Sequence, residues 1–223
     1  MPIALTTLFP DGSVPDREWV LGQSIRFDPA AVRARLPDAA MWPDELDSVS
    51  AGSGRYRVVS RRDVFEVAAR AVQDGSPIVA AQLHVACVVW GTSPGLTMVR
   101  ALRPLSQPDA AEKLAKALAV VRTEGPVSAY KALSGRNRLK ITGLAAGFFT
   151  KFLYFGGYDA NALTGRPLIY DSRVVDSLRR VTTEEWEIDG PADMYGRYLD
   201  LAADWAHDFD TTPDVIERAL FGR

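Results

Sequence analysis

The sequence predicts an all-α fold, and three observations support this prediction. Apolar residues recur at helical spacing in almost every segment after residue 27. Capping residues, prolines and glycines mark where these segments begin and end. The chain shows no βαβ alternation, no turn dipeptide between alternating strands, no GxGxxG and no phosphate-binding loop sequence, so a nucleotide-binding α/β fold is disfavoured.

The composition is that of a globular protein. The chain has 223 residues, of which 47% are hydrophobic and 24% charged, enough for one sizeable core or for two small lobes. No apolar run reaches the roughly 18 to 20 residues of a membrane span, and the start does not resemble a signal peptide, so we expect a cytoplasmic protein. One cysteine and two distant histidines argue against a metal site. We expect a monomer with no metal and no cofactor.

The chain is expected to begin irregularly. Prolines and glycines interrupt residues 1–27, whereas residues 28–223 read as a single helical domain. Its first helix, 28–36, has an aspartate at the cap and a proline directly after it. A second helix, 60–73, opens with a capping serine and places its valines and alanines on one face.

Two long helices are expected in the middle of the chain. Residues 77–91 are apolar almost all round, which is typical of a central helix covered on every side; the length favours this over a buried strand. Residues 108–124 form an alanine-rich amphipathic helix that Gly125 and Pro126 close.

Residues 126–180 read as one unit of helix, hairpin and helix. A short helix covers 126–134, a polar connector follows, and an apolar helix begins near residue 148 and ends at paired glycines. Asp171 then stands where it would cap a further helix. Two more helices are expected within 191–209 and 212–221.

This unit resembles the helix-hairpin-helix DNA glycosylases, and within them the 8-oxoguanine DNA glycosylase branch. The resemblance rests on the hairpin GLAAG at 143–147, on the pair Thr150-Lys151, and on PLIYDSRVVDSLRR around Asp171. It covers about a quarter of the chain closely. Lys151 and Asp171 are 171 − 151 = 20 residues apart, similar to the spacing of the nucleophilic lysine and the aspartate in the eukaryotic-type enzymes.

The resemblance implies a fold and an activity. We expect two helical lobes around a DNA-binding groove, and an enzyme that flips out and excises a modified or damaged base, with an 8-oxoguanine-like lesion as the best guess. A lysine Schiff base would add β-lyase activity.

Two departures from the family pattern leave the lysine open. The family's usual hairpin has a glycine where Ala145 stands, and its lysine position falls nearer Gly147 than Lys151. Lys140 is a rival, because 171 − 140 = 31 is similar to the spacing in the archaeal branch.

The two catalytic candidates fit the chemistry of base removal. Breaking the bond to the base builds positive charge at the anomeric carbon, which the carboxylate of Asp171 would stabilise in a poorly hydrated cleft. An amine is a nucleophile only when neutral, and the apolar helix around Lys151 disfavours its ammonium form by desolvation.

Further residues are expected to bind double-stranded DNA and the flipped base. Backbone N–H groups of the hairpin (Gly143, Leu144, Ala145 and Gly147) would hold a phosphate. From Lys131 to Lys151, five cations and no acid occur in an acidic chain, including Arg136, Arg138 and Lys140; the arginines 55, 57, 61 and 62 form a second basic group. Aromatic candidates for the base pocket are Phe148, Phe149, Tyr154, Trp42 and Trp90.

Two alternatives remain open at this stage. The glycosylase could act on modified bases of phage DNA in antiviral defence rather than on damaged genomic DNA. The chain could also be a non-catalytic DNA-binding module of the same fold. A separation of more than about 10 Å between the side chains of Lys151 and Asp171 would favour the second alternative, because catalytic groups must reach one substrate.

Overall fold

The computed structural model describes residues 3–92, 95–160 and 165–222, and almost all regular structure within them is helical. This confirms the predicted all-α fold. The elements in chain order are α1 (Leu5–Leu8), α2 (Arg17–Leu21), β1 (Ser24–Phe27), α3 (Pro29–Arg33), η1 (Ala39–Met41), α4 (Glu45–Ser48), β2 (Arg57–Ser60), α5 (Arg61–Asp74), α6 (Pro77–Gly91), α7 (Leu96–Leu102), η2 (Arg103–Ser106), α8 (Ala110–Thr123), α9 (Pro126–Leu133), α10 (Ala146–Gly157), α11 (Ser172–Val181), α12 (Ala192–Asp208) and α13 (Pro213–Phe221).

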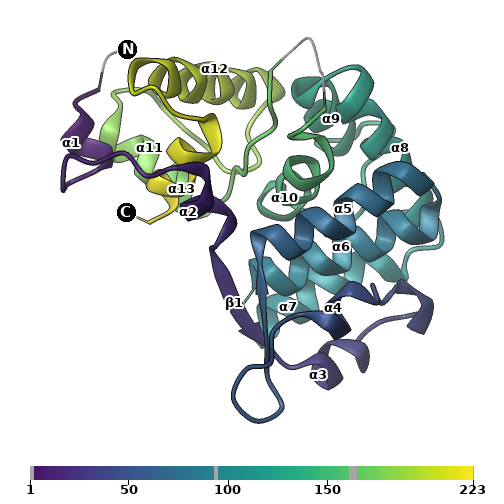
Figure 1. Cartoon of the computed structure of the whole chain (residues 1–223). Helices are drawn as coiled ribbons and strands as arrows, with labels where there is room; N and C mark the ends of the chain where they lie inside the picture. The colour runs from purple at the N-terminus through teal and green to yellow at the C-terminus, as the bar shows by residue number, and fades with distance from the viewer. Residues whose placement is uncertain (1–2, 93–94, 161–164, 223) are drawn as a thin grey trace.

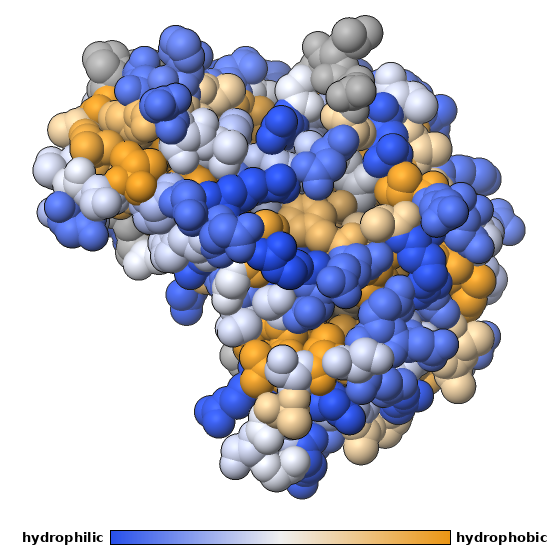
Figure 2. Space-filling model, viewed as in Figure 1, coloured by the Kyte–Doolittle hydropathy of each residue, from blue (hydrophilic) through white to orange (hydrophobic). Residues whose placement is uncertain are grey.

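The helices form two lobes that meet at α9 and α10 (Figure 1). One lobe combines the two ends of the chain, because α1 and α2 pack against α13, and α13 packs against α11 and α12. The other lobe contains α3 to α8, with α6 between α5, α8 and α10. Hydrophilic side chains cover most of the surface in this view, and the outline is concave below the crossing from α2 to β1 (Figure 2).

Helix α6 is the centre of the larger lobe, as the sequence predicts. Eleven of its fifteen residues are buried, which explains why its sequence has no polar face. His84 lies in this helix with its Nε2 3.1 Å from the carbonyl oxygen of Ala101, while its Nδ1 has no hydrogen-bond partner among the residues that the structure describes. Cys87 is also buried, as a small residue of the core.

The predicted caps position several helices. Ser60 and Asp63 form a capping box at α5, in which each side chain bonds the other's backbone N–H. Asp28 accepts from the amides of Ala30 and Ala31 at the start of α3. Asp171 accepts from the amide of Val174 and so begins α11 at the predicted residue.

Residues 3–27 contain short regular elements that the sequence analysis did not anticipate. Residues 5–8 and 17–21 form α1 and α2, and β1 pairs antiparallel with β2, Ser24 opposite Ser60 and Phe27 opposite Arg57. Helices of four and five residues have little stability of their own, so contact with α13 rather than helix propensity explains them. The strands are four residues each and far apart in the chain, too short for a readable alternation.

Only one arginine of the second basic group is removed from the surface, since Arg55 and Arg62 are exposed and Arg57 is half-buried. Arg61 is fully buried and pairs with Glu217, and Arg62 pairs with Glu18. Arg55 pairs with Asp28, and Arg57 donates to the carbonyl oxygen of Val49. Each of the four thus has a partner within the chain, but only Arg61 forms its ion pair away from solvent.

Candidate active site

Lys151 and Asp171 meet at the junction of the two lobes. The Nζ atom of Lys151 lies 2.7 Å from Oδ2 of Asp171 and also donates to the carbonyl oxygen of Gly147 at 2.7 Å. Only 6% of the lysine side chain and 14% of the aspartate side chain are exposed. The pair is therefore a short, largely desolvated contact between an amine and a carboxylate.

The chain before Asp171 is held against α10 by hydrogen bonds. The amide of Tyr170 donates to Oγ1 of Thr150, the residue next to Lys151. The hydroxyls of Tyr195 and Tyr198 donate to the carbonyl oxygens of Leu168 and Ile169. The two residues thus have different tasks. Thr150 fixes the extended segment that ends at Tyr170, and Lys151 contacts Asp171, the residue that follows this segment.

Each oxygen of Asp171 has its own partner. Oδ1 caps α11 by accepting from the amide of Val174 at 3.3 Å, while Oδ2 accepts from Lys151. Burial alone raises the pKa of this carboxyl group, but the charge and hydrogen bond of Lys151 and the amides of Val174 and Arg173 outweigh that effect and lower the pKa. Asp171 is therefore ionised at neutral pH.

Glycines make room for this pair on two sides. A Cβ atom on Gly91, the last residue of α6, would lie 2.8 Å from Cδ of Lys151. A Cβ atom on Gly147 would lie 3.5 Å from Cβ of Asp171. The lysine stem thus lies directly against the end of α6, and the aspartate against the first turn of α10.

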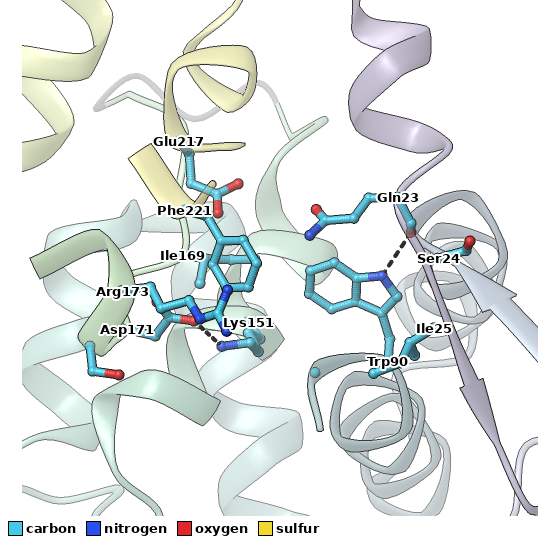
Figure 3. A pocket seen from close by; sticks show the side chains of 12 residues that line it. Gln23, Ser24, Ile25, Trp90, Lys151, Ile169, Asp171, Arg173, Glu217 and Phe221 are labelled. Atoms are coloured by element: carbon cyan, nitrogen blue, oxygen red, sulfur yellow. Dashed lines mark hydrogen bonds and ion pairs between the residues drawn. The ribbon is translucent and has the colours of Figure 1, made fainter. Parts of the chain in front are cut away.

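The pair lies at one side of a cavity of about 380 Å³ between the lobes (Figure 3). Five separate segments of the chain line it. They contribute residues 23–25, Trp90 and Gly91, Lys151, Ile169 with 171–173, and Glu217 with Phe221. Its walls thus combine two aromatic rings, one side-chain amide, two separate carboxylates and two cations.

Beside the cavity lies a second ion pair, fully buried. Nη1 and Nη2 of Arg61 donate to the two carboxylate oxygens of Glu217 at 2.6 and 3.3 Å. The Arg61 guanidinium also lies 4.8 Å from the ring centroid of Trp90, and its Nε donates to Oε1 of Gln23 at 2.8 Å. Arg61 therefore supports two residues of the cavity wall at once.

The aromatic candidates separate into two groups. Trp90 lines the cavity, and the Phe148 ring centroid lies 5.8 Å from Nζ of Lys151. Phe149, Tyr154 and Trp42 are buried elsewhere, Phe149 against Tyr130, Tyr154 against Phe65, and Trp42 against Phe27 under Arg33. The structure thus brings only the first group near the lysine.

The hairpin between α9 and α10 turns at Gly143. The amide of Leu144 donates to the carbonyl oxygen of Ile141, and Gly143 has φ +83°, as the third residue of a type II turn requires. Gly143 and Ala145 are exposed and Leu144 is buried. The amide of Ala146, the first residue of α10, donates to Oδ1 of Asp189 at 2.6 Å.

Lys140 belongs to this hairpin and not to the cavity. It is half-buried and lines a separate pocket with Gly143, Ala145 and Asp189, and its carbonyl oxygen accepts from Lys113. The cavity that holds Asp171 has Lys151 as its lysine. Geometry therefore favours the eukaryotic-type spacing over the archaeal one.

The exposed basic side chains near the hairpin are Lys131 on α9 and Arg136 and Arg138 in the connector. Arg138 lies 3.6 Å from Glu124, and Lys151 is buried and is not part of this surface. Arg100 and Arg103, exposed residues of α7 and η2, line a pocket together with Thr142 and Gly143. They add two cations next to the hairpin that the sequence analysis did not single out.

Most residues that line the cavity were not singled out from the sequence, among them Gln23, Arg173 and Phe221. Gln23 lay in the segment expected to be irregular, and Phe221 lay at the end of a helix whose apolar face gave no sign of a cavity. Only Arg173 had a usable signal, because it follows the predicted cap Asp171 by two residues. Within the described residues, no three His, Cys, Asp or Glu side chains gather to hold a metal ion.

Comparison with models of known protein families gives a match. The family model described as "Putative 8-oxoguanine DNA glycosylase OGG-like protein" matches residues 18–221, almost the whole chain. Searches of curated proteins and of solved structures gave no significant match. No helix of the described residues is long and apolar enough to cross a membrane.

Proposed function

The chain belongs to the OGG-like family of 8-oxoguanine DNA glycosylases, and from this we propose that it removes a modified base from double-stranded DNA with Lys151 as nucleophile and Asp171 as the charge-stabilising carboxylate. The observation that carries the proposal is the 2.7 Å contact between these two side chains at the wall of a cavity. This contact favours an enzyme over a non-catalytic DNA-binding module, because in such a module Lys151 and Asp171 would not share a cleft.

The first step is the exchange of one bond for another at the anomeric carbon. The bond from C1′ to the base breaks while the Nζ atom of Lys151 forms a bond to C1′. The ammonium group gives one proton to the departing base, which therefore leaves neutral, and the positive charge stays on the Lys151 nitrogen that is now bonded to C1′. Asp171 remains ionised and stabilises the positive charge on the sugar, because its environment lowers its pKa.

The second step makes the enzyme bifunctional. The sugar ring opens as the C1′–O4′ bond breaks, O4′ takes up a proton, and the nitrogen of Lys151 becomes part of a Schiff base. Loss of a proton from C2′ then expels the 3′ phosphate, and hydrolysis releases the lysine. The strand is thus cut at the site where the base was removed.

We infer the base class from the family, whose description names 8-oxoguanine. A cavity of about 380 Å³ lined by Trp90 and Phe221 suits one flipped base stacked between aromatic walls. The duplex itself would lie over the hairpin and the exposed cations Arg136, Arg138, Arg100 and Arg103, which neutralise phosphates without reading sequence.

Two assays with the same duplex test this function. Purified protein is incubated with duplexes that carry 8-oxoguanine or other modified bases, including bulky phage-type cytosines, and heat or alkali then reveals abasic sites. Borohydride added during the reaction traps a Schiff base as a covalent protein–DNA adduct. Base release together with an adduct supports the proposal, whereas release without any adduct would make water the nucleophile. If no duplex yields an abasic site or an adduct, the catalytic proposal fails and the alternative of a non-catalytic DNA-binding module is favoured.

A further inference from the structure

Resting on the proposed function, we propose that Gln23 reads the flipped base by donating a hydrogen bond from its side-chain amide to an acceptor atom on the base. Gln23 directly precedes β1, where the chain crosses from one lobe to the other, and it lines the cavity that holds Lys151 and Asp171. The family description assigns no role to Gln23.

The orientation of the Gln23 amide follows from its partner. Nε of Arg61 lies 2.8 Å from the Gln23 side chain, and a guanidinium can only donate. The contacting atom of Gln23 must therefore be the oxygen, Oε1. The NH₂ group is left on the other side of the amide plane, and Figure 3 shows it pointing into the space between Trp90 and Phe221.

Arg61 cannot turn away to release this orientation. It is fully buried, and its other nitrogens are held by both carboxylate oxygens of Glu217. The indole Nε1 of Trp90 donates to the backbone carbonyl oxygen of Gln23 at 3.0 Å, which fixes the backbone of the same residue. The Gln23 side chain is thus held rigidly at the cavity as a hydrogen-bond donor, because its oxygen already accepts a hydrogen bond from Arg61.

The cavity has the arrangement that reading a base requires. The rings of Trp90 and Phe221 stand on either side of the space in Figure 3, with Lys151 and Asp171 at one end and the Gln23 amide at the other. A nucleotide whose sugar lies at Lys151 would place its base between the rings and an edge of the base at Gln23. A fixed donor there favours an edge that presents a carbonyl oxygen or an unprotonated ring nitrogen.

Binding rather than cleavage provides the test, so that it does not depend on the chemistry. Duplexes carry 2′-fluoroarabino-8-oxoguanine or 2′-fluoroarabino-5-hydroxymethylcytosine, which resist excision, and a third duplex carries tetrahydrofuran in place of the nucleoside. The ratio of the Kd for the tetrahydrofuran duplex to the Kd for the base-bearing duplex isolates recognition of the base. It is measured for the native protein, Gln23→Met, Gln23→Glu and, as the matched control, Gln73→Met, which makes the same change at an exposed residue of α5 outside the cavity wall.

The two Gln23 variants separate reading from a merely structural role. Glutamate keeps the oxygen that Arg61 contacts but replaces the donor with a second acceptor, whereas methionine loses both. Reading predicts that Gln23→Met reduces the ratio about tenfold for the preferred base and that Gln23→Glu reduces it further, because two acceptors then face each other. The affinity for the tetrahydrofuran duplex and the ratio for Gln73→Met stay unchanged.

Other results overturn the inference and can be told apart from failure of the proposed function. A Gln23→Glu ratio equal to the native one, with a loss only in Gln23→Met, would make Gln23 a structural partner of Arg61. A native protein that prefers neither base over tetrahydrofuran would show that the cavity reads no base. If the ratios follow the predicted order but the native protein excises nothing from the cleavable duplexes, the reading role stands and the catalytic proposal fails.

Discussion

Nζ of Lys151 lies 2.7 Å from Oδ2 of Asp171, although the two residues are 20 positions apart and belong to different helices. The other oxygen of Asp171 caps α11, so the carboxylate cannot rotate without losing a helix cap. The pair is thereby held in place before any substrate binds, and this has consequences for several variants.

The first prediction concerns the nucleophile. Lys151→Gln abolishes the borohydride-trapped adduct, because an amide cannot form a Schiff base, while affinity for duplex DNA changes little since the lysine is buried. Lys140→Gln, the matched control in the hairpin, keeps the adduct. Denaturing electrophoresis of labelled duplex measures both. An adduct that survives in Lys151→Gln and disappears in Lys140→Gln would assign the nucleophile to Lys140 instead.

Asp171→Asn separates the charge from the cap. Asparagine can still accept from the amide of Val174, so α11 is kept, but it cannot stabilise positive charge on the sugar. Single-turnover base release should fall about 10² to 10³-fold. Full activity in this variant would mean that the carboxylate serves only the helix.

The same variant has a defined pH signature in stability. The folded pKa of Asp171 is lowered, so its contribution to stability is present above the ordinary carboxyl pKa and is lost as pH falls through the folded value. The difference in unfolding free energy between the native protein and Asp171→Asn should therefore be largest near neutral pH and shrink in acid. Urea titrations at several pH values measure it; a difference that grows in acid would contradict the lowered pKa.

Gly91→Ala tests the packing against the lysine stem. The new methyl group would lie within 3.0 Å of Cδ and Cε of Lys151, so the lysine must shift away from its contact with Asp171. We expect base release to fall at least tenfold with the fold intact. Gly196→Ala on α12 is the control, because its Cβ meets Val127 at 3.4 Å and alanine favours the helix by about 1 kcal/mol. Equal activity in both variants would show that the lysine tolerates displacement.

The exposed cations of the connector should set the salt dependence of DNA binding. Replacing Arg136 and Arg138 together by alanine should weaken binding to all sequences alike and lower the slope of log K against log salt by about 2, roughly one unit for each lost phosphate contact. Arg33→Ala, on α3 and paired with Asp47, is the control. Fluorescence anisotropy between low and physiological salt gives the slopes, and an unchanged slope would place the duplex elsewhere.

The burial of His84 leads us to expect that the protein loses stability in mild acid. Burial lowers its pKa to about 4, and the contact with the Ala101 carbonyl opposes this only in part. The unfolded chain takes up the proton near the ordinary pKa of 6.5, so the free energy of unfolding falls as pH drops from about 6.5 to about 4, by up to about 3 kcal/mol. His84→Gln should flatten this decline in denaturant titrations, whereas His207→Gln on α12 should leave it.

Local signals in the sequence predicted most of the helical structure. The caps at Asp28, Ser60 and Asp171 and the all-apolar sequence of α6 act within a few residues, so they could be recognised without knowing the fold. The hairpin and the Thr150-Lys151 pair are equally local, and their resemblance to a family led to the right fold and to the right family.

What the sequence determined by itself is therefore the longer helices, the hairpin, and the pairing of Lys151 with Asp171; the short helices α1, α2, α4 and α7 were not expected. Tertiary structure alone decided which other side chains join this pair. Gln23 and Phe221 come from opposite ends of the chain and lie in one cavity because α1 and α2 pack on α13 and β1 then pairs with β2. Arg61 resembled a surface cation in the sequence, and it is buried because Glu217, 156 residues later, supplies the opposite charge. Such contacts depend on how distant segments pack and leave no local pattern, which is why the lysine and aspartate could be named in advance and the walls of their cavity could not.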